Sequence, residues 1–268
     1  MNVIIRKTEK DMGKAAANDA AELLRYYTSV KKKNIVITFA AAPSQSAFLA
    51  ALTREKGIDW SKVIAFHMDE YLDLPDGHPN TFKDFLNKQV VSRVPLHRKN
   101  VTFIKDMQAS SKNLCREYGA LFTKAVKSVR AKGGVYIVFM GIGVNGHIAF
   151  NEPGTNLWTK KPIVPVTIDA TSVRQQYNDY KNDPNPKARY ASLADVPRKA
   201  VTMSPAGLLD ADRIFCIVPG PQKADAVKKT VESAISDKVP ATLLRLHENV
   251  RLYIDGASAG KLLKKPSL

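Results

Sequence analysis

The segment from Val135 to Thr155 reads VYIVFMGIGVNGHIAFNEPGT, and it begins with the unbroken apolar run VYIVFM. An apolar run without alternation is typical of a strand that is buried on both faces, as in a parallel sheet covered by helices. Gly141, Gly143 and Gly146 follow with the spacing G-x-G-x-x-G. The segment therefore predicts a buried strand that ends in a glycine-rich loop. Such a loop can bind a dinucleotide, turn the chain or hold catalytic groups.

A dinucleotide site requires that the glycine-rich loop open a helix, because the pyrophosphate binds at the N-terminus of that helix. Asp169 lies roughly 20 residues beyond the loop, where a ribose-binding acid is expected. However, Pro153, Gly154 and Pro162 lie in between and would interrupt a crossover helix. We therefore expect no dinucleotide site.

Two titratable side chains lie in the same loop. His147 and Glu152 follow the end of the expected strand, at the edge where α/β sheets bind their ligands. The Asn145-Gly146 pair is a strong turn signal that requires no chemistry. A turn alone does not explain why a histidine and a carboxylate are found together there. Their combination favours acid–base catalysis.

The stretch FHMDEYLDLP, residues 66–75, carries two adjacent acids after another apolar run. Adjacent residues on an extended segment point to opposite sides. One of Asp69 and Glu70 can therefore face a pocket while the other serves the structure. A solvated pair of loop acids is the alternative interpretation.

Strand-like and helix-like segments alternate along the rest of the chain, which favours a largely parallel sheet covered on both faces. The expected strands are residues 34–41, 62–67, 100–104, 163–169, 199–204, 213–218 and 250–255. The expected helices are residues 44–57, 81–93, 110–132 and 221–235. Residues 177–197 lack periodicity and predict a surface loop or lid.

The composition is that of a globular protein, with 44% hydrophobic and 25% charged residues, and no linker divides residues 1–268. We therefore expect one domain. The net charge of +16 favours anionic partners. The basic residues form short scattered clusters without interleaved aromatic residues, so we expect no nucleic-acid partner. No apolar run approaches the roughly 18 residues of a membrane span. Cys115 and Cys216 lie far apart in apolar contexts, which favours reduced cysteines in a cytoplasmic protein.

Together, the two motif-bearing stretches resemble the glucosamine-6-phosphate deaminase (isomerase) family, which is grouped with the 6-phosphogluconolactonases. The family pattern M-D-E-Y-x-x-L-P is present at residues 68–75, and G-x-G-x-[DN]-G-H-I-[AG]-F-N-E-P is present at residues 141–153. The resemblance extends from about Val3 to Leu263. Lactonase relatives lack F-N-E-P and usually have Arg in place of Tyr71, so the deaminase branch is favoured.

The resemblance implies a three-layer, Rossmann-like α/β fold with a mostly parallel central sheet and no dinucleotide site. It also implies conversion of an amino-sugar 6-phosphate and water into a ketose 6-phosphate and ammonia, without a metal or an organic cofactor. Some family members are hexamers, so the resemblance also admits a homo-oligomer.

The same resemblance implies a role for each motif residue. Asp69 matches the base that moves a proton from C2 to C1 of the sugar, and His147 matches the group that opens the ring. Glu152 matches the acid that orients and tunes the imidazole. Asn145 is expected to orient the imidazole by accepting a hydrogen bond from it.

The expected phosphate site departs from the family pattern. Where the family has a loop T-G-[GS]-T-P, this chain has AAPSQ at residues 41–45, so the glycines that let backbone amides surround a phosphate are missing. Lys223 matches the phosphate lysine, and Arg174 lies near the phosphate arginine, although Gln176 is closer in register. The expected substrate-binding residues are Ala41, Ala42, Ser44, Gln45, Gly141, Gly143, Arg174 and Lys223. The expected ligand is a phosphorylated amino sugar.

Two alternatives stay open from the sequence. A lactonase of sugar phosphates shares the G-H segment of the loop. A binding module that senses sugar phosphates without turnover is compatible with the altered loop at residues 41–45.

Overall fold

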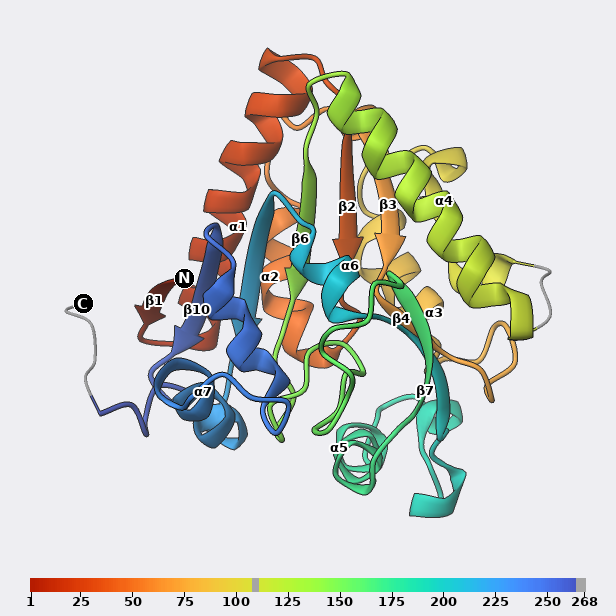
Figure 1. The fold of residues 1–268 in the computed structure, drawn as a ribbon, viewed down its shortest axis with the longest axis vertical. Helices are drawn as coiled ribbons and strands as arrows, with labels where there is room; N and C mark the ends of the chain where they lie inside the picture. Colours follow the sequence, from red (N-terminus) through yellow and green to blue (C-terminus); the bar gives the residue numbers. More distant parts are fainter. Residues whose placement is uncertain (108–110, 264–268) are drawn as a thin grey trace.

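The computed structural model describes residues 1–107 and 111–263 of the chain. Its centre is a seven-stranded sheet in the order β1-β10-β9-β6-β2-β3-β5, in which all neighbouring strands are parallel (Figure 1). The strands are β1 (Asn2–Arg6), β2 (Ile35–Phe39), β3 (Val63–His67), β5 (Val101–Thr102), β6 (Tyr136–Met140), β9 (Arg213–Val218) and β10 (Val250–Asp255). The expected parallel sheet is confirmed, and β1 adds one strand at its edge.

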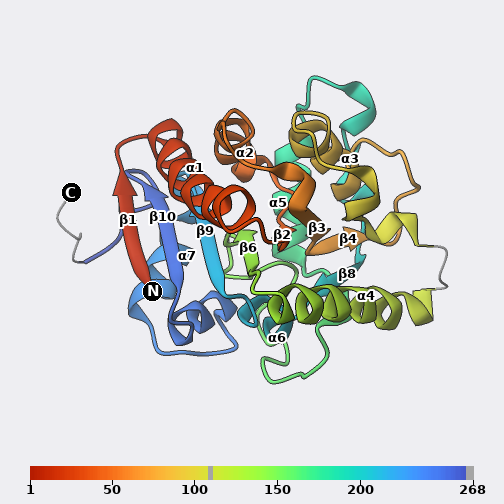
Figure 2. The same ribbon diagram turned by 90° about the horizontal axis from the view of Figure 1, so that it is seen from above.

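Helices cover both faces of the sheet, which confirms the three-layer α/β architecture (Figure 2). In β2, Ile35, Ile37 and Phe39 pack with the helices of one layer, and Val36 packs with those of the other. This two-sided burial is the physical reason why the strands read as unbroken apolar runs. The first layer contains α1 (Glu9–Arg25), α2 (Ser46–Leu52) and α3 (Phe82–Leu86), and the second contains α4 (Ser111–Ala131), α6 (Pro205–Leu209) and α7 (Ala224–Glu232).

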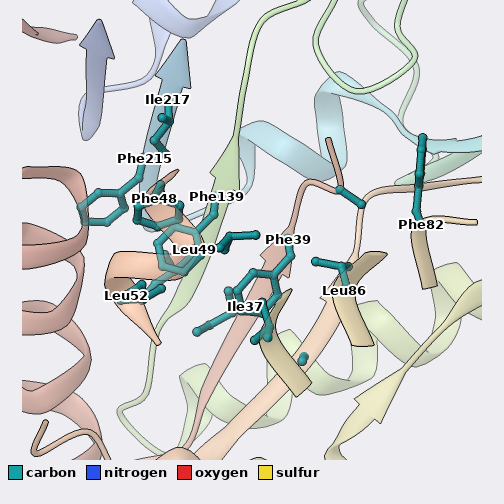
Figure 3. Packing of buried hydrophobic residues seen from close by; sticks show 14 of the residues in the cluster. Ile37, Phe39, Phe48, Leu49, Leu52, Phe82, Leu86, Phe139, Phe215 and Ile217 are labelled. Carbon is teal, nitrogen blue, oxygen red and sulfur yellow. The ribbon is translucent and has the colours of Figure 1, made fainter. Parts of the chain in front are cut away.

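Aromatic side chains pack where β2 and β6 approach their carboxyl ends (Figure 3). The ring of Phe139 lies 5.5 Å from that of Phe39, 5.0 Å from that of Phe48 and 5.5 Å from that of Phe215, measured between centroids. All four side chains are buried. Because Phe139 lies two residues before Gly141, this cluster gives the glycine-rich loop a rigid base.

A second, three-stranded sheet has the order β4-β8-β7 and is antiparallel. Its strands are β4 (Asp69–Tyr71), β7 (Ile163–Thr167) and β8 (Lys199–Met203). The sequence pattern does not separate β7 and β8 from the strands of the parallel sheet, but the structure does. Pro165 has no N–H for a second ladder, which suits β7 as an edge strand paired with β8. This small sheet holds β4, and therefore Asp69, beside the main sheet.

The glycine-rich loop after β6 turns back on itself and opens no helix between Gly141 and Pro162. The N–H of Gly146 donates to the carbonyl of Gly143 at 3.0 Å, and the N–H of Gly143 donates to the carbonyl of His147 at 2.9 Å. Gly146 has a φ of 86°, which favours glycine. The turn expected at Asn145-Gly146 is confirmed, and the helix that a dinucleotide motif needs is replaced by this turn.

Several helices differ from the sequence-based expectation. In residues 81–93, α3 is followed by one π-helical turn at Asn87–Val91. The long helix α4 begins at Ser111, and its expected first residue, Ser110, lies outside the described residues. Residues 177–197 are not all loop, because α5 (Ala170–Tyr180) includes the first of them. The helices α1, α5 and α6 are absent from the sequence-based expectation.

Two further observations concern membrane-spanning helices and the cysteines. Within residues 1–107 and 111–263, no helix is both long enough and apolar enough to cross a bilayer. Cys216 is buried in β9, Cys115 is half-buried in α4, and both are free.

Candidate active site

A cavity opens at the carboxyl ends of β2 and β6, next to β4 and α5. Carboxyl ends of parallel strands meet at one edge, so side chains far apart in the sequence converge there. Phe82 and Phe150 supply apolar wall, and their rings stack on each other. Of the predicted site residues, those in the wall are Ala41, Ala42, Ser44, Gln45, Asp69, Gly141, Gly143, His147 and Lys223.

The imidazole of His147 is held at its Nδ1 atom. Nδ1 lies 3.2 Å from Oε2 of Glu152 and 3.0 Å from Oγ of Ser172. An ionised carboxylate can only accept a hydrogen bond, so Nδ1 carries the proton in neutral His147. Nε2 is then unprotonated and carries a lone pair that can accept a proton. It lies in the cavity wall and makes no hydrogen bond to another described residue.

Glu152 is ionised at neutral pH although it is largely buried. Burial raises its pKa, but the hydrogen bond and charge of His147, with the Ser172 hydroxyl and the Asn145 amide, outweigh burial and lower the pKa to about 2. Glu152 and His147 are only 11% and 12% exposed in their side chains. The site therefore keeps a permanent negative charge behind the imidazole.

Asn145 does not make the contact with the imidazole that is expected from the sequence. Its amide group does not accept a hydrogen bond from the imidazole. Instead, Nδ2 donates to Oε2 of Glu152 at 2.8 Å and to Oδ2 of Asp169 at 2.9 Å, and Oδ1 accepts from the backbone N–H of His147 at 3.1 Å. The turn brings the Asn145 amide under Glu152 rather than beside the ring. Asn145 therefore contacts the carboxylate beside the imidazole and the backbone of His147, and not the ring itself.

The acid pair at residues 69 and 70 is divided between the cavity and the backbone. Glu70 accepts hydrogen bonds from the N–H groups of Tyr71, Phe82 and Lys83, at 2.9 to 3.1 Å. Asp69 lines the cavity, and its carboxyl group makes no hydrogen bond to another described residue. Burial, with a smaller contribution from the negative charge of Glu70, raises the pKa of Asp69 well above its usual value. A free carboxyl group with a raised pKa is suited to proton transfer.

The far end of the cavity carries a buried cation. Lys223 is 5% exposed, and among the described residues its Nζ has one weak hydrogen bond, to Oε1 of Gln175 at 3.4 Å. Burial lowers its pKa to about 8, although the charge of Asp179 opposes this. Lys223 also lies directly before α7, whose N-terminus favours an anion. This end of the cavity therefore suits an anionic group.

The residues after β2 form a compact loop with few free donors. Pro43 has no N–H, and the N–H of Gln45 donates to the carbonyl of Ala42 at 2.9 Å. The side chain of Gln45 is 1% exposed and donates from Nε2 to the carbonyl of Ile217 at 3.1 Å. Its Oε1 atom is buried without a partner among the described residues. A β-carbon on Gly141 would lie 2.9 Å from Nε2 of Gln45, so the absence of a side chain at Gly141 leaves space for the Gln45 amide.

Arg174 is the predicted substrate-binding residue that the structure places away from the cavity. It is exposed on α5, whereas Gln175 and Gln176 line the cavity. Successive residues turn by about 100° around a helix, so Gln176 and Arg174 point to different sides. The structure therefore agrees with the alignment in which Gln176, and not Arg174, takes the place of the family's phosphate arginine.

Sequence reasoning missed three polar residues of this site. Ser172 and Gln175 have no motif of their own, and Asp169 was considered only as a ribose-binding acid. The available signal is Asp169 itself, because an aspartate directly before a helical segment is typical of an N-cap, whose side chain accepts from a backbone N–H of the first turn. The side chain of Asp169 accepts from the N–H of Ser172 at 2.7 Å.

A larger groove, of about 1020 Å³, lies between α4 and β7. Among the residues that the structure describes, its lining contains no carboxylate and no histidine. Within the described part of the chain, no three or more histidine, cysteine or acidic side chains gather as a metal site would need. The acid–base groups are concentrated in the cavity of His147 and Asp69.

Comparison with known proteins agrees with this geometry. A sequence profile of the glucosamine-6-phosphate isomerases/6-phosphogluconolactonases matches residues 7–253. The chain belongs to this family. A glucosamine-6-phosphate deaminase of Thermoanaerobacter sp. is 30% identical over 262 residues, which cover 97% of this chain and 94% of that protein.

Solved structures of family members have the same fold. A monomeric glucosamine-6-phosphate deaminase superposes with a TM-score of 0.82 at 26% identity, covering 97% of this chain and 99% of that one. A 6-phosphogluconolactonase from Trypanosoma brucei superposes with a TM-score of 0.71 at 18% identity, covering 97% and 98%. The second likeness concerns the fold alone.

Proposed function

We propose that this family member converts glucosamine 6-phosphate and water into fructose 6-phosphate and ammonia. The observation that carries the proposal is that one cavity brings together an imidazole–carboxylate pair, a free carboxyl group and a buried lysine. His147, backed by Glu152, and Asp69 supply acid–base groups, and Lys223 supplies a buried cation. The full-length similarity to glucosamine-6-phosphate deaminases supports the same reaction.

The first step is opening of the pyranose ring. Nε2 of neutral His147 accepts the proton of the anomeric hydroxyl, and the resulting imidazolium donates it to the ring oxygen. The carboxylate of Glu152, 3.2 Å from Nδ1, stabilises the imidazolium in between. One group thus serves as base and acid within a single cycle.

The second step is proton transfer between two neighbouring carbons. Asp69 removes the C2 proton, which gives an enolamine, and returns it at C1. The ammonium group on C2 of the substrate lies beside Asp69 in this proposal and lowers the pKa that burial has raised. Water then adds to the C2 iminium group, and ammonia leaves as the ketone forms.

The phosphate lies at the other end of the cavity. Lys223 and the N-terminus of α7 provide positive potential, and Ser44, Gln175 and Gln176 provide neutral polar groups. This set contains one cation in the cavity, whereas the family pattern also has an arginine. In this proposal the phosphate group is therefore bound by fewer positively charged side chains than in the family pattern.

The direct test is release of ammonia from glucosamine 6-phosphate by the purified protein. Asp69→Asn should reduce kcat by about 10² or more, because the amide cannot accept the C2 proton. Asp76→Asn is a matched control, because this acid lies seven residues after Asp69 and pairs with Lys83 outside the cavity. Solvent deuterium incorporation at C1 of the ketose reports the proton transfer independently of ammonia release.

The same preparation distinguishes the two other functions. Hydrolysis of 6-phosphogluconolactone without ammonia release would support a lactonase. Binding of glucosamine 6-phosphate with no turnover, measured by calorimetry, would support a sensing module and contradict the proposed reaction.

A further inference from the structure

The hydrogen bonds around His147 close into a ring that returns to the atom where it starts. From Nδ1 of His147 the ring passes to Glu152, then to Nδ2 of Asn145 and to Oδ2 of Asp169. From Oδ1 of Asp169 it passes to the N–H of Ser172, whose hydroxyl lies 3.0 Å from the same Nδ1 atom. Asp169 is the member of this ring that contributes one oxygen to each branch.

We propose that Asp169 is a positioning residue of the active site. Through Asn145 it holds Glu152 against Nδ1 of His147, and through the start of α5 it places the Ser172 hydroxyl at the same atom. Asp169 does not touch the sugar and acts on the reaction through the imidazole. This inference rests on the proposed function for its kinetic consequences, and on the geometry alone for its effect on His147.

The orientation of Asn145 is fixed by its surroundings. Its Oδ1 accepts from the backbone N–H of His147 at 3.1 Å, and its Nδ2 donates to two carboxylates. The flipped amide would place oxygen against both carboxylates and nitrogen against an N–H group. Each hydrogen of the amide therefore has one acceptor. If Asp169 lost its acceptor oxygen, Asn145 would be free to leave Glu152.

A purely structural role for Asp169 is a helix cap. Its side chain caps α5 by accepting from the N–H of Ser172, and asparagine caps helices as well as aspartate does. An asparagine at this position would, however, have one acceptor atom where Asp169 uses two. If its oxygen keeps the cap, the new NH₂ group opposes the Asn145 amide and the branch to Glu152 is broken. A cap and a positioning residue therefore respond differently to the same substitution.

The experiment compares Asp169→Asn with Asp59→Asn, which changes a capping aspartate far from the cavity. We expect Asp169→Asn to lower kcat by about tenfold and to shift the pH–rate profile, with KM little changed. Asp59→Asn should change none of these quantities. Unaltered kcat and an unaltered pH profile in Asp169→Asn would overturn the proposal, since that result fits a cap alone.

A second variant covers the case in which Asp169→Asn folds poorly. Asp169→Ser keeps a short capping oxygen and removes the carboxylate that Asn145 contacts. It should show the same loss of kcat while the thermal midpoint changes little. A loss of activity that merely follows a fall in stability across both variants would contradict the proposal.

The state of the imidazole gives a readout that needs no turnover. In protein labelled with ¹⁵N-histidine, long-range ¹⁵N–¹H spectra at about pH 8.5, where ordinary imidazoles are neutral, report the tautomer. His147→Gln assigns the signal. Wild-type His147 should be protonated at Nδ1, and Asp169→Asn should give a mixture of tautomers. An unchanged tautomer overturns the proposal even if the wild-type protein releases no ammonia, so the two failures are distinguishable.

Discussion

Gly143 and His147 share one space in the cavity wall. A β-carbon on Gly143 would lie 2.2 Å from both Cε1 and Nε2 of His147. Gly143 was expected to contact the substrate, and its geometry shows a second function, because only a residue without a side chain lets the imidazole lie there. The position of the imidazole thus depends on the missing side chain of Gly143, next to Cε1 and Nε2, and on the carboxylate of Glu152, next to Nδ1.

Gly143→Ala should therefore abolish most activity. Its backbone does not require a glycine conformation, so the methyl group acts by displacing the ring, and a displacement of about 1 Å can cost 10²-fold in rate. Steady-state kinetics and thermal unfolding measure the two effects separately. Gly119→Ala is the control, because its β-carbon meets Pro162 at an ordinary 3.4 Å. Wild-type activity in Gly143→Ala would contradict this placement of His147.

Asn145→Asp should make activity and stability fall as pH rises from acidic to neutral values. The new oxygen would lie where Nδ2 now donates to Glu152 and Asp169, and three carboxylates in contact cannot all be ionised. One of them keeps a proton with a raised pKa, so its contribution to stability is complete at acidic pH and is lost as pH rises through that pKa.

For this variant we expect a kcat lower by about tenfold at neutral pH and a smaller loss near pH 5.5. Asn249→Asp, in the exposed turn before β10, adds the same charge away from the cavity. Profiles of kcat and of the thermal midpoint against pH check the expectation. A variant whose two profiles parallel those of the wild type would argue against the contact of Asn145 with both acids.

Lys223 should make substrate binding weaken above about pH 8. Burial lowers the pKa of Lys223 to about 8, so the free protein loses this positive charge as pH rises through that value. The sugar phosphate is already a dianion there. KM for glucosamine 6-phosphate should rise toward tenfold per pH unit above the pKa of Lys223, while kcat changes less.

Lys223→Met should raise KM at pH 7 by about 10² and remove the alkaline rise, because the methionine carries no charge at any pH. Lys228→Met changes a partly exposed lysine of α7 that pairs with Glu232 and serves as the control. If Lys223→Met retained the alkaline rise, another group would be responsible for it.

Ala149 should tolerate glycine better than an ordinary alanine does. Its φ is 50°, a left-handed conformation that costs a residue with a side chain about 1 kcal/mol. Ala149→Gly should leave the free energy of unfolding unchanged or raise it by up to about 1 kcal/mol, because relief of strain offsets the entropy of glycine in the unfolded chain. Ala50→Gly, within α2, should lower it by about 1 kcal/mol.

Urea unfolding of the two variants measures this contrast. Ala149→Val gives the opposite sign, because a branched side chain is least compatible with positive φ. Equal losses of stability in Ala149→Gly and Ala50→Gly would show that Ala149 is not strained.

The central sheet and the main catalytic candidates could be read from the amino-acid sequence. The run at 135–140 is apolar at every position because β6 is buried on both faces, and that property is local enough to read without coordinates. The same holds for Asp69, His147 and Glu152, which lie in two contiguous motifs at strand ends. Adjacent acids on an extended strand also had to point to opposite sides, and Asp69 and Glu70 do so.

The remaining features of the site depend on contacts between distant segments. Ser172 reaches His147 across 25 positions of sequence, and Asn145 meets Asp169 across 24, so no local pattern contains either pair. Arg174 points away from the cavity because successive residues are rotated by about 100° around the helix axis, so residues that are close in sequence can face opposite sides of α5. The hydrogen-bonded ring around the imidazole exists because α5 returns to the loop after β6. Chain return of this kind is set by packing of the whole molecule and not by the residues of either segment.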